Sequence, residues 1–277
     1  MLDFMKHPSF GIALGGGGAR ALAHIGVLKV LEREGIKPDF IVGTSMGGII
    51  ALAYANGATP GDLEAEALKM ASLRQLVRLV DGFPPRRGLV QGAKLRQYFI
   101  DDIGLDTTFD DLTIPCQVCA VDLERAECVA IQEGLIVDAA LATSAVPGLF
   151  PPVQLHGRKL VDGGLLDNVP VRLLEAQKVK RTLAVDVSIH IQPSEAEAKR
   201  ESLPFLPSFS VDAINAIIVM TNAIMQYRLH EHPPDVLIQP HIPADIGILT
   251  GFTHAEEVIS SGVKAAEAAL PSIKRLL

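Results

Sequence analysis

The chain has 277 residues, a length that suits one large domain or two small ones and can bury a sizeable core. Apolar residues make up 48% of it against 21% charged, with no low-complexity run, which excludes a disordered tail protein. Lys and Arg number 25 against 32 Asp and Glu, a net charge of −7; with no basic cluster, nucleic acid is a poor candidate partner.

The first sixty residues alternate between strand and helix patterns. Residues 10–14 and 39–43 are short apolar runs rich in branched side chains, as expected of buried strands. Residues 19–34 repeat apolar side chains at helical spacing, and residues 46–56 predict a second helix that ends at Asn-Gly. Two strand-to-helix units in succession predict a parallel sheet with right-handed crossovers.

Further along the chain, helix and strand patterns continue to alternate. Residues 62–111 are mostly helical in pattern, and residues 116–122 and 128–132 predict a hairpin. The remaining expected helices are 135–143, 171–178, 211–227 and 254–270, and the remaining strands are 158–161, 182–187 and 236–239. The pattern predicts a three-layer α/β/α fold around a central, mostly parallel sheet.

We expect one domain over residues 1–277, with the motifs described below in about 9–190 and a C-terminal strand and helix in 233–277. Prolines make the start of 191–232 the best candidate for a lid. The apolar segment 203–225 could cover a groove for acyl chains, but a helix that is apolar around most of its circumference favours core.

Cysteine usage and hydropathy indicate a cytoplasmic protein without a membrane anchor. The three cysteines, Cys116, Cys119 and Cys128, are an odd number in a chain too large to need disulfides. The Cys-x-x-Cys pair has strand-like flanks, so we interpret these side chains as small, buried and apolar rather than as metal ligands. Glycines and polar residues interrupt each long uncharged stretch, so neither export nor a membrane span is expected.

The sequence GTSMG, residues 43–47, lies directly between a predicted strand and a predicted helix. A serine at that position sits on a sharp turn that exposes its hydroxyl, and the turn requires small neighbours such as Gly43 and Gly47. This context makes Ser45 a candidate nucleophile. The alternative is that Ser45 only caps the helix that follows.

The glycine-rich loop at residues 15–20, GGGGAR, also joins a predicted strand to a predicted helix and can present backbone N–H groups to an anion. The anion could be a tetrahedral oxyanion or a nucleotide phosphate. Gly16, Gly18 and Ala21 nearly match the dinucleotide fingerprint, with Asp39 as the acid that follows. Parallel neighbouring strands would bring this loop and the serine to the same sheet edge, which favours acyl transfer.

A serine nucleophile needs a base, and His230, His232 and His241, around a proline-rich turn, stay open as candidates although none is flanked by the small residues expected of a crowded site. Asp162 is so flanked, because Gly163 and Gly164 follow it at the end of a predicted strand. Its carboxylate could accept the Ser45 proton directly. The alternative is that this Asp-Gly pair only begins a turn.

The motifs GGGGAR, GTSMG, ATSAVPGLFPPV and VDGGLLDNVPV, in this order, resemble bacterial patatin-like phospholipases, lipid acyl hydrolases with a Ser-Asp dyad. The resemblance covers most of the chain, and the C-terminal GFTHAEEVISSG is similar to the bacterial members. It implies that Ser45 is the nucleophile and Asp162 the base. It also implies an oxyanion hole built from the amides of Gly16, Gly17 and Gly18.

The resemblance also assigns the supporting positions of the motifs. Arg20 matches the basic residue of the glycine-rich motif, whereas Ala21 departs from the glycine found in many members. The implied chemistry needs no metal and no cofactor. The expected partner is a phospholipid, a lysophospholipid or another acyl ester, with transient contact at a membrane surface. A general carboxylesterase or thioesterase and a nucleotide-binding regulator remain the alternatives.

Overall fold

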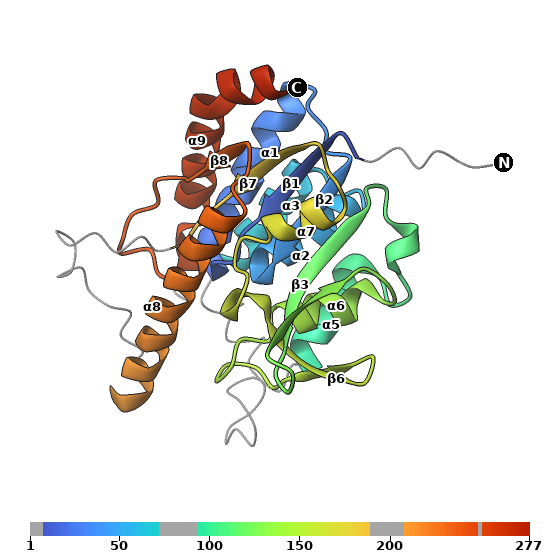
Figure 1. The fold of residues 1–277 in the computed structure, drawn as a ribbon, viewed down its shortest axis with the longest axis vertical. Helices are drawn as coiled ribbons and strands as arrows, with labels where there is room; N and C mark the ends of the chain where they lie inside the picture. Colours follow the sequence, from blue (N-terminus) through green and yellow to red (C-terminus); the bar gives the residue numbers. More distant parts are fainter. Residues whose placement is uncertain (1–7, 72–92, 189–207, 249–250) are drawn as a thin grey trace.

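The computed structural model describes residues 8–71, 93–188, 208–248 and 251–277 (Figure 1). Among these residues, eight strands form one sheet in the order β5-β6-β3-β2-β1-β7-β8, with β4 paired to β3. The strands are β1 (Phe10–Leu14), β2 (Phe40–Thr44), β3 (Cys116–Asp122), β4 (Glu127–Ile131), β5 (Val153–Leu155), β6 (Arg158–Asp162), β7 (Arg181–Val185) and β8 (Val236–Ile238).

The helices fill the connections between strands. They are α1 (Ala23–Arg33), α2 (Ser45–Ala55), α3 (Pro60–Met70), α5 (Ala93–Ile103), α6 (Ile136–Thr143), α7 (Val171–Ala176), α8 (Ser208–Glu231) and α9 (Ala255–Leu276). Short 3-10 helices are η1 (Gly18–Leu22), η2 (Phe109–Asp111), η3 (Gly163–Leu165) and η5 (Gly251–His254).

The sheet is mostly parallel, as the alternating pattern predicts. β1 pairs in parallel with β2 and β7, β2 with β3, and β7 with β8. β3 pairs antiparallel with β4 and β6, and β5 antiparallel with β6. The carboxyl ends of β1 and β2 therefore lie side by side at one edge of the sheet.

Helices cover both faces of the sheet. Strand residues such as Ile12 and Leu14 belong to the larger core cluster, together with side chains of α1, α2, α6 and α9. The intervening Ala13 belongs to a smaller cluster with side chains of α7 and α8. This alternation along β1 is what a strand buried on both faces requires.

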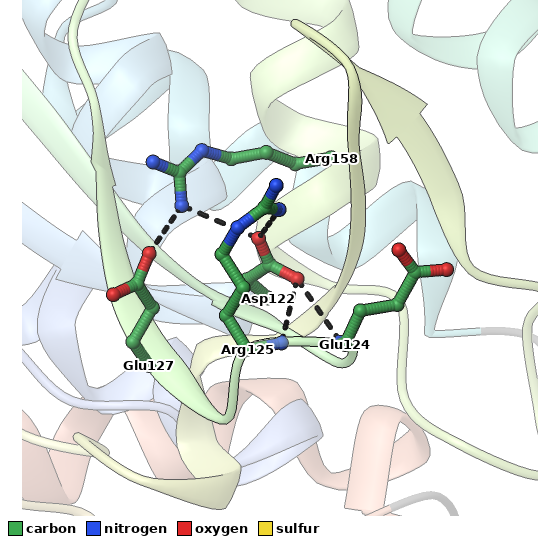
Figure 2. A network of polar contacts seen from close by, with 5 residues as sticks. All are labelled: Asp122, Glu124, Arg125, Glu127 and Arg158. Atoms are coloured by element: carbon green, nitrogen blue, oxygen red, sulfur yellow. Dashed lines mark hydrogen bonds and ion pairs between the residues drawn. The ribbon is translucent and has the colours of Figure 1, made fainter.

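A network of charged side chains holds the β3–β4 hairpin against β6 (Figure 2). The Asp122 carboxylate, fully buried at the end of β3, accepts hydrogen bonds from the backbone N–H groups of Glu124 and Arg125. Arg125 and Arg158 donate to its other oxygen at 2.7 and 3.2 Å, and Arg158 also pairs with Glu127. The turn between β3 and β4 is thereby fixed beside β6.

The structure differs from the expectations at β5, at the end of α9 and in α8. The sequence pattern misses β5, which has three residues and pairs only with β6 among the described strands. The helix expected to stop at residue 270 continues through Pro271. The carbonyl that loses its N–H partner to this proline belongs to the exposed Glu267 and can bind water.

The apolar segment 203–225 is not the core element that its composition suggests. Residues 191–207, which include the proline-rich start of the candidate lid, lie outside the described residues. In α8, Ile217, Val219 and Met220 are 40%, 54% and 62% exposed, whereas Met225 is buried. The first half of this helix extends away from the sheet (Figure 1), and over residues 216–231 Met225 is the buried side chain.

None of the helices in the described part of the chain is long and apolar enough to cross a membrane.

Candidate active site

Ser45 occupies the sharp turn between β2 and α2. It is the first residue of the helix and has φ 54°, a left-handed conformation that a non-glycine residue adopts at a cost. A Cβ at Gly43 would overlap the backbone of Gly47 and Gly48, and one at Gly47 would overlap the carbonyl oxygens of Leu14 and Gly15. The flanking glycines are therefore required by close backbone contact, and the Ser45 residue remains partly exposed.

A buried threonine fixes the backbone of this turn. The N–H of Ser45 donates to Oγ1 of Thr143 at 2.9 Å, and that hydroxyl donates to the carbonyl of Cys119 at 2.6 Å. Thr143 is the last residue of α6 and is fully buried. The strained turn is thus hydrogen-bonded through one side chain to the backbone of β3.

The register of β3 brings the serine and the aspartate together. Thr44, the residue before Ser45, pairs with Cys119 of β3, and Asp162 pairs with the adjacent Ala120. β2 ends where β6 takes over the pairing with β3. Two residues far apart in the sequence therefore leave the sheet at neighbouring positions.

The Asp162 carboxyl is 5% exposed and has one firm hydrogen bond. Its Oδ1 accepts the N–H of Gly164 at 2.7 Å, while Oδ2 is buried without a hydrogen-bond partner among the described residues. Burial raises the pKa of Asp162 to about 6, against the Ser45 hydroxyl and the Gly164 N–H, which both lower it. Oδ2 of Asp162 is therefore an oxygen available to accept a proton, and the Ser45 hydroxyl is close enough to lower the pKa of this carboxyl.

The glycines that follow Asp162 are also required by close contacts. A Cβ at Gly163 would overlap the carbonyl of Cys119, on the strand between the two candidate residues. A Cβ at Gly164 would lie 2.9 Å from Asn168 Oδ1 and 3.1 Å from Asp162 Oδ1. Larger residues there would displace the carboxylate from its position.

The glycine-rich loop lies beside this turn, but not all of its amides are free. The N–H of Gly16 donates to the carbonyl of Asn168 at 3.0 Å, so the oxyanion role implied for the Gly16 amide needs correction. Gly17 and Gly18 are partly exposed, and their N–H groups have no hydrogen bond to a described residue. A Cβ at Gly16 would lie 3.1 Å from the Cβ of Ser45, so the loop and the serine are direct neighbours.

Two residues outside the predicted set hold this loop in place. Asn168 donates from Nδ2 to the carbonyl of Gly16 at 3.1 Å while its own carbonyl binds the Gly16 N–H. His24, fully buried, bonds through Nε2 to the carbonyl of Gly15 at 2.7 Å, and burial lowers its pKa to about 4. Asn168 lies in the VDGGLLDNVPV motif, and the motif context was the signal that could have pointed to it.

Arg20 is structural in its contacts. The side chain is 4% exposed and donates to the carbonyls of Val187 and Ile246 at 3.0 Å, and of Pro243 and Ile242 at 3.1 and 3.4 Å. It ties the helix after the glycine-rich loop to the segment that follows β8. Arg20 therefore supports the loop through backbone contacts.

The position of Asp39 contradicts the dinucleotide-binding interpretation, which needs an acidic residue near the glycine-rich loop. Asp39 lies before the first residue of β2, and because β1 and β2 are parallel, that end is opposite the glycine-rich loop. The Asp39 carboxylate also accepts the backbone N–H groups of Ser9 and Phe10 at 2.9 and 3.0 Å. It cannot serve a ribose bound at the other edge of the sheet.

Comparison with known proteins decides the family. The model of the patatin-like phospholipase family matches residues 12–175, a range that includes the glycine-rich loop, Ser45 and Asp162. The chain belongs to this family. An uncharacterized NTE family protein of Mycobacterium bovis is 31% identical over 217 residues, which are 78% of this chain and 58% of that protein. This patatin-like chain therefore spans little more than half the length of that relative.

Two further matches agree. Lysophospholipase NTE1 of Mycosarcoma maydis is 33% identical over 193 residues, 65% of this chain and 10% of that protein. The crystal structure of VipD from Legionella pneumophila matches with a TM-score of 0.50 at 13% identity, covering 96% of this chain and 67% of that one. At that identity the VipD match supports the patatin-like fold alone.

One group of potential metal ligands lies on the β3–β4 hairpin and the segment that follows Asp162. Within the described ranges, the group of side chains whose ligand atoms come close enough for one ion consists of Cys119, Cys128 and Asp167. It includes neither Ser45 nor Asp162.

Proposed function

We propose that this chain is a serine acyl hydrolase that cleaves ester bonds of phospholipids or lysophospholipids. The observation that carries the proposal is the register of β3, which brings Ser45 and Asp162 to adjacent positions beside the glycine-rich loop. Membership of the patatin-like phospholipase family supports lipid ester hydrolysis, and the geometry supports a Ser-Asp dyad as its means.

In the proposed mechanism, Asp162 accepts the proton of the Ser45 hydroxyl as Oγ attacks the ester carbonyl. A base whose pKa lies near 6 is ionised at neutral pH and retains useful basicity. The N–H groups of Gly17 and Gly18 stabilise the oxyanion of the tetrahedral intermediate. Asp162 then returns the proton to the leaving alcohol, and water releases the acyl group from Ser45 by the same steps in reverse.

The substrate class rests on the relatives. One relative is named a lysophospholipase, and the family model is named for phospholipases. The dyad itself acts on the acyl carbonyl and places no demand on the leaving group. Simple carboxylic esters and acyl thioesters are therefore the alternatives that the substrate panel must separate.

The test is covalent labelling followed by turnover assays. A fluorophosphonate should add to Ser45 and be found there by peptide mass spectrometry. Activity is then measured on phosphatidylcholine vesicles, lysophosphatidylcholine, a short-chain nitrophenyl ester and an acyl thioester. Hydrolysis of the lipid substrates in preference to the short ester supports the proposal.

Ser45→Ala should lower the turnover rate by at least about a thousandfold, because the nucleophile contributes more to this rate than any single oxyanion donor does. Ser144→Ala is the control for loss of a serine hydroxyl nearby in the fold, since the Ser144 hydroxyl is buried and, among the described residues, bonds to the carbonyl of Ala140. Equal activity of the two variants, or labelling at a serine other than Ser45, would overturn the dyad.

A further inference from the structure

Two cysteine side chains meet on the face of the sheet covered by α7 and α8, and one of them, Cys119, pairs with the residue before Ser45. Cys119 lies on β3 and Cys128 on β4, and the register pairs Cys119 with Ala130 and Val121 with Cys128. The two cysteines are therefore diagonal neighbours on one face of the hairpin. Their sulfurs and a carboxylate oxygen of Asp167 all lie within 4.8 Å of one another.

The two thiols differ in reactivity. Cys128 is partly exposed; the hydrogen bond with Cys119 lowers its pKa, and the positive charges of Arg172 and Arg228 act in the same direction. Cys119 is fully buried, and the same hydrogen bond together with burial raises its pKa well above the usual value. Cys128 is therefore the more accessible and the more acidic thiol of the pair.

A metal ion fits this group less well than thiol chemistry does. The Asp167 carboxylate already has a cationic partner, because Nε of Arg172 lies 3.5 Å from its Oδ2. The charges of Arg172 and Arg228 both act on this cluster and would repel a divalent cation. Structural zinc sites have four ligands, whereas this group has three among the described residues.

We propose that Cys128 and Cys119 form a peroxide-sensitive dithiol whose oxidation to a disulfide slows the chemistry at Ser45. The Cys128 thiolate attacks one oxygen of a hydroperoxide such as hydrogen peroxide: an S–O bond forms, the O–O bond breaks, and hydroxide leaves to become water. The Cys119 sulfur then attacks the Cys128 sulfenic acid, forming the S–S bond as hydroxide leaves and takes up the thiol proton. Two thiols lose two electrons, and one peroxide becomes two waters.

The bridge would act on the serine turn through β3. Diagonal neighbours in a hairpin have Cα atoms about 7–8 Å apart, more than the roughly 4.4–6.8 Å of most disulfides. Closing the bridge must therefore pull β4 and β3 together at Cys119. The carbonyl of Cys119 accepts the Thr143 hydroxyl that binds the N–H of Ser45, and Gly163 packs against the same carbonyl.

The experiment oxidises the full chain with hydrogen peroxide and follows two readouts. Peptide mass spectrometry without reductant should detect a Cys119–Cys128 disulfide. The rate of fluorophosphonate addition to Ser45 and the rate of ester hydrolysis should each fall about tenfold to a hundredfold, because small displacements of a reacting group have costs of that size. Dithiothreitol should restore both rates.

Two variants control the result. Cys128→Ser, on the strand that carries no catalytic group, should keep the basal rate and resist peroxide. Cys116→Ala, which removes the other buried cysteine of β3, should remain as sensitive as the wild type. Loss of activity by peroxide in Cys128→Ser would show that another residue is responsible.

The disulfide readout does not depend on the proposed function, whereas the rate readout rests on it. Absence of the disulfide in oxidised wild-type protein overturns the proposal, as does a disulfide that leaves the Ser45 rates unchanged. Stoichiometric zinc in protein purified without chelator, with both thiols protected, would overturn it in favour of a metal site. A chain with no hydrolysis before oxidation contradicts the hydrolase proposal, and the peptide analysis still decides the dithiol.

Discussion

The carboxyl of Asp162 is 5% exposed, and burial raises its pKa to about 6 against the Ser45 hydroxyl and the Gly164 N–H, which both lower it. Among the described residues, no arginine or lysine acts on this pKa, whereas two arginines bind the Asp122 carboxylate at the end of β3. Desolvation without a counter-charge is how a carboxyl becomes a usable base near neutrality.

The pH dependence of turnover follows from this raised pKa. The base form of Asp162 is lost as the pH falls below about 6, so kcat/KM on a soluble ester should decline about tenfold per pH unit below that value. Steady-state kinetics across the acid range measure the slope and midpoint. A midpoint near 4, the value of an unperturbed aspartate, would mean that burial does not tune this group.

Burial of Asp162 should also reduce stability. The folded protein holds the proton up to about pH 6 and the unfolded chain only up to 3.8, so the free energy of unfolding falls as the pH rises through this interval. Asp162→Asn removes the buried charge and should raise that free energy above pH 6 by about 1–3 kcal/mol while abolishing turnover.

Thermal unfolding of Asp162→Asn and wild type at neutral and acid pH tests this sign, because the difference should vanish once the wild-type carboxyl is protonated. The exposed Asp110→Asn provides the control for a general loss of negative charge. A lower unfolding temperature for Asp162→Asn at neutral pH would contradict the expected cost of the charge.

At the scale of secondary structure, β3 aligns the candidate site. Its residues Cys119 and Ala120 pair with the strand ends that carry the serine and the aspartate. Thr143, at the end of α6, links that strand to the turn through hydrogen bonds of 2.6 and 2.9 Å. The geometry of the site is therefore set by where β2 and β6 meet along β3.

Thr143→Val keeps the shape of the side chain but removes both hydrogen bonds. The Ser45 turn, with φ 54°, would lose the acceptor for its N–H, so kcat should fall about tenfold to a hundredfold with little change in KM. Thr143→Ser retains the hydroxyl and should stay close to wild type. Equal kcat for the valine and serine variants would show that the threonine only fills space.

At the scale of the whole molecule, Arg20 connects the glycine-rich loop to two distant segments of the chain. Its guanidinium binds the carbonyl of Val187, after β7, and those of Ile242, Pro243 and Ile246, after β8. The planar guanidinium can direct several donors to carbonyls on separate segments, which a lysine ammonium cannot do in one position.

Arg20→Lys should therefore lower the free energy of unfolding by about 2–4 kcal/mol, because several buried carbonyls lose their donors. Denaturant unfolding monitored by circular dichroism gives the value. Arg33→Lys is the matched control, since the Arg33 side chain is 54% exposed and its ion pairs are on the surface. Similar stability of both variants would contradict a structural role for Arg20.

Most elements could be predicted because their signals are local. The apolar runs predict β1 and β3 at the observed bounds, and the predicted helix ends at 143 and 56 lie within one residue of the observed ends. β5 was missed because three residues with an alternating pattern give no usable period. The exposure of Met220 was missed because composition alone cannot tell a buried helix from an unpartnered one.

The sequence by itself determined which residues are the candidates for the reactive groups, because a glycine-flanked serine after a strand and an aspartate before two glycines are local patterns with steric causes. Only the tertiary structure decided how these groups meet. The Gly16 amide is occupied by Asn168, 152 residues away, and the Ser45 amide by Thr143, 98 residues away. Such contacts depend on strand register and packing between distant segments, which no local pattern specifies.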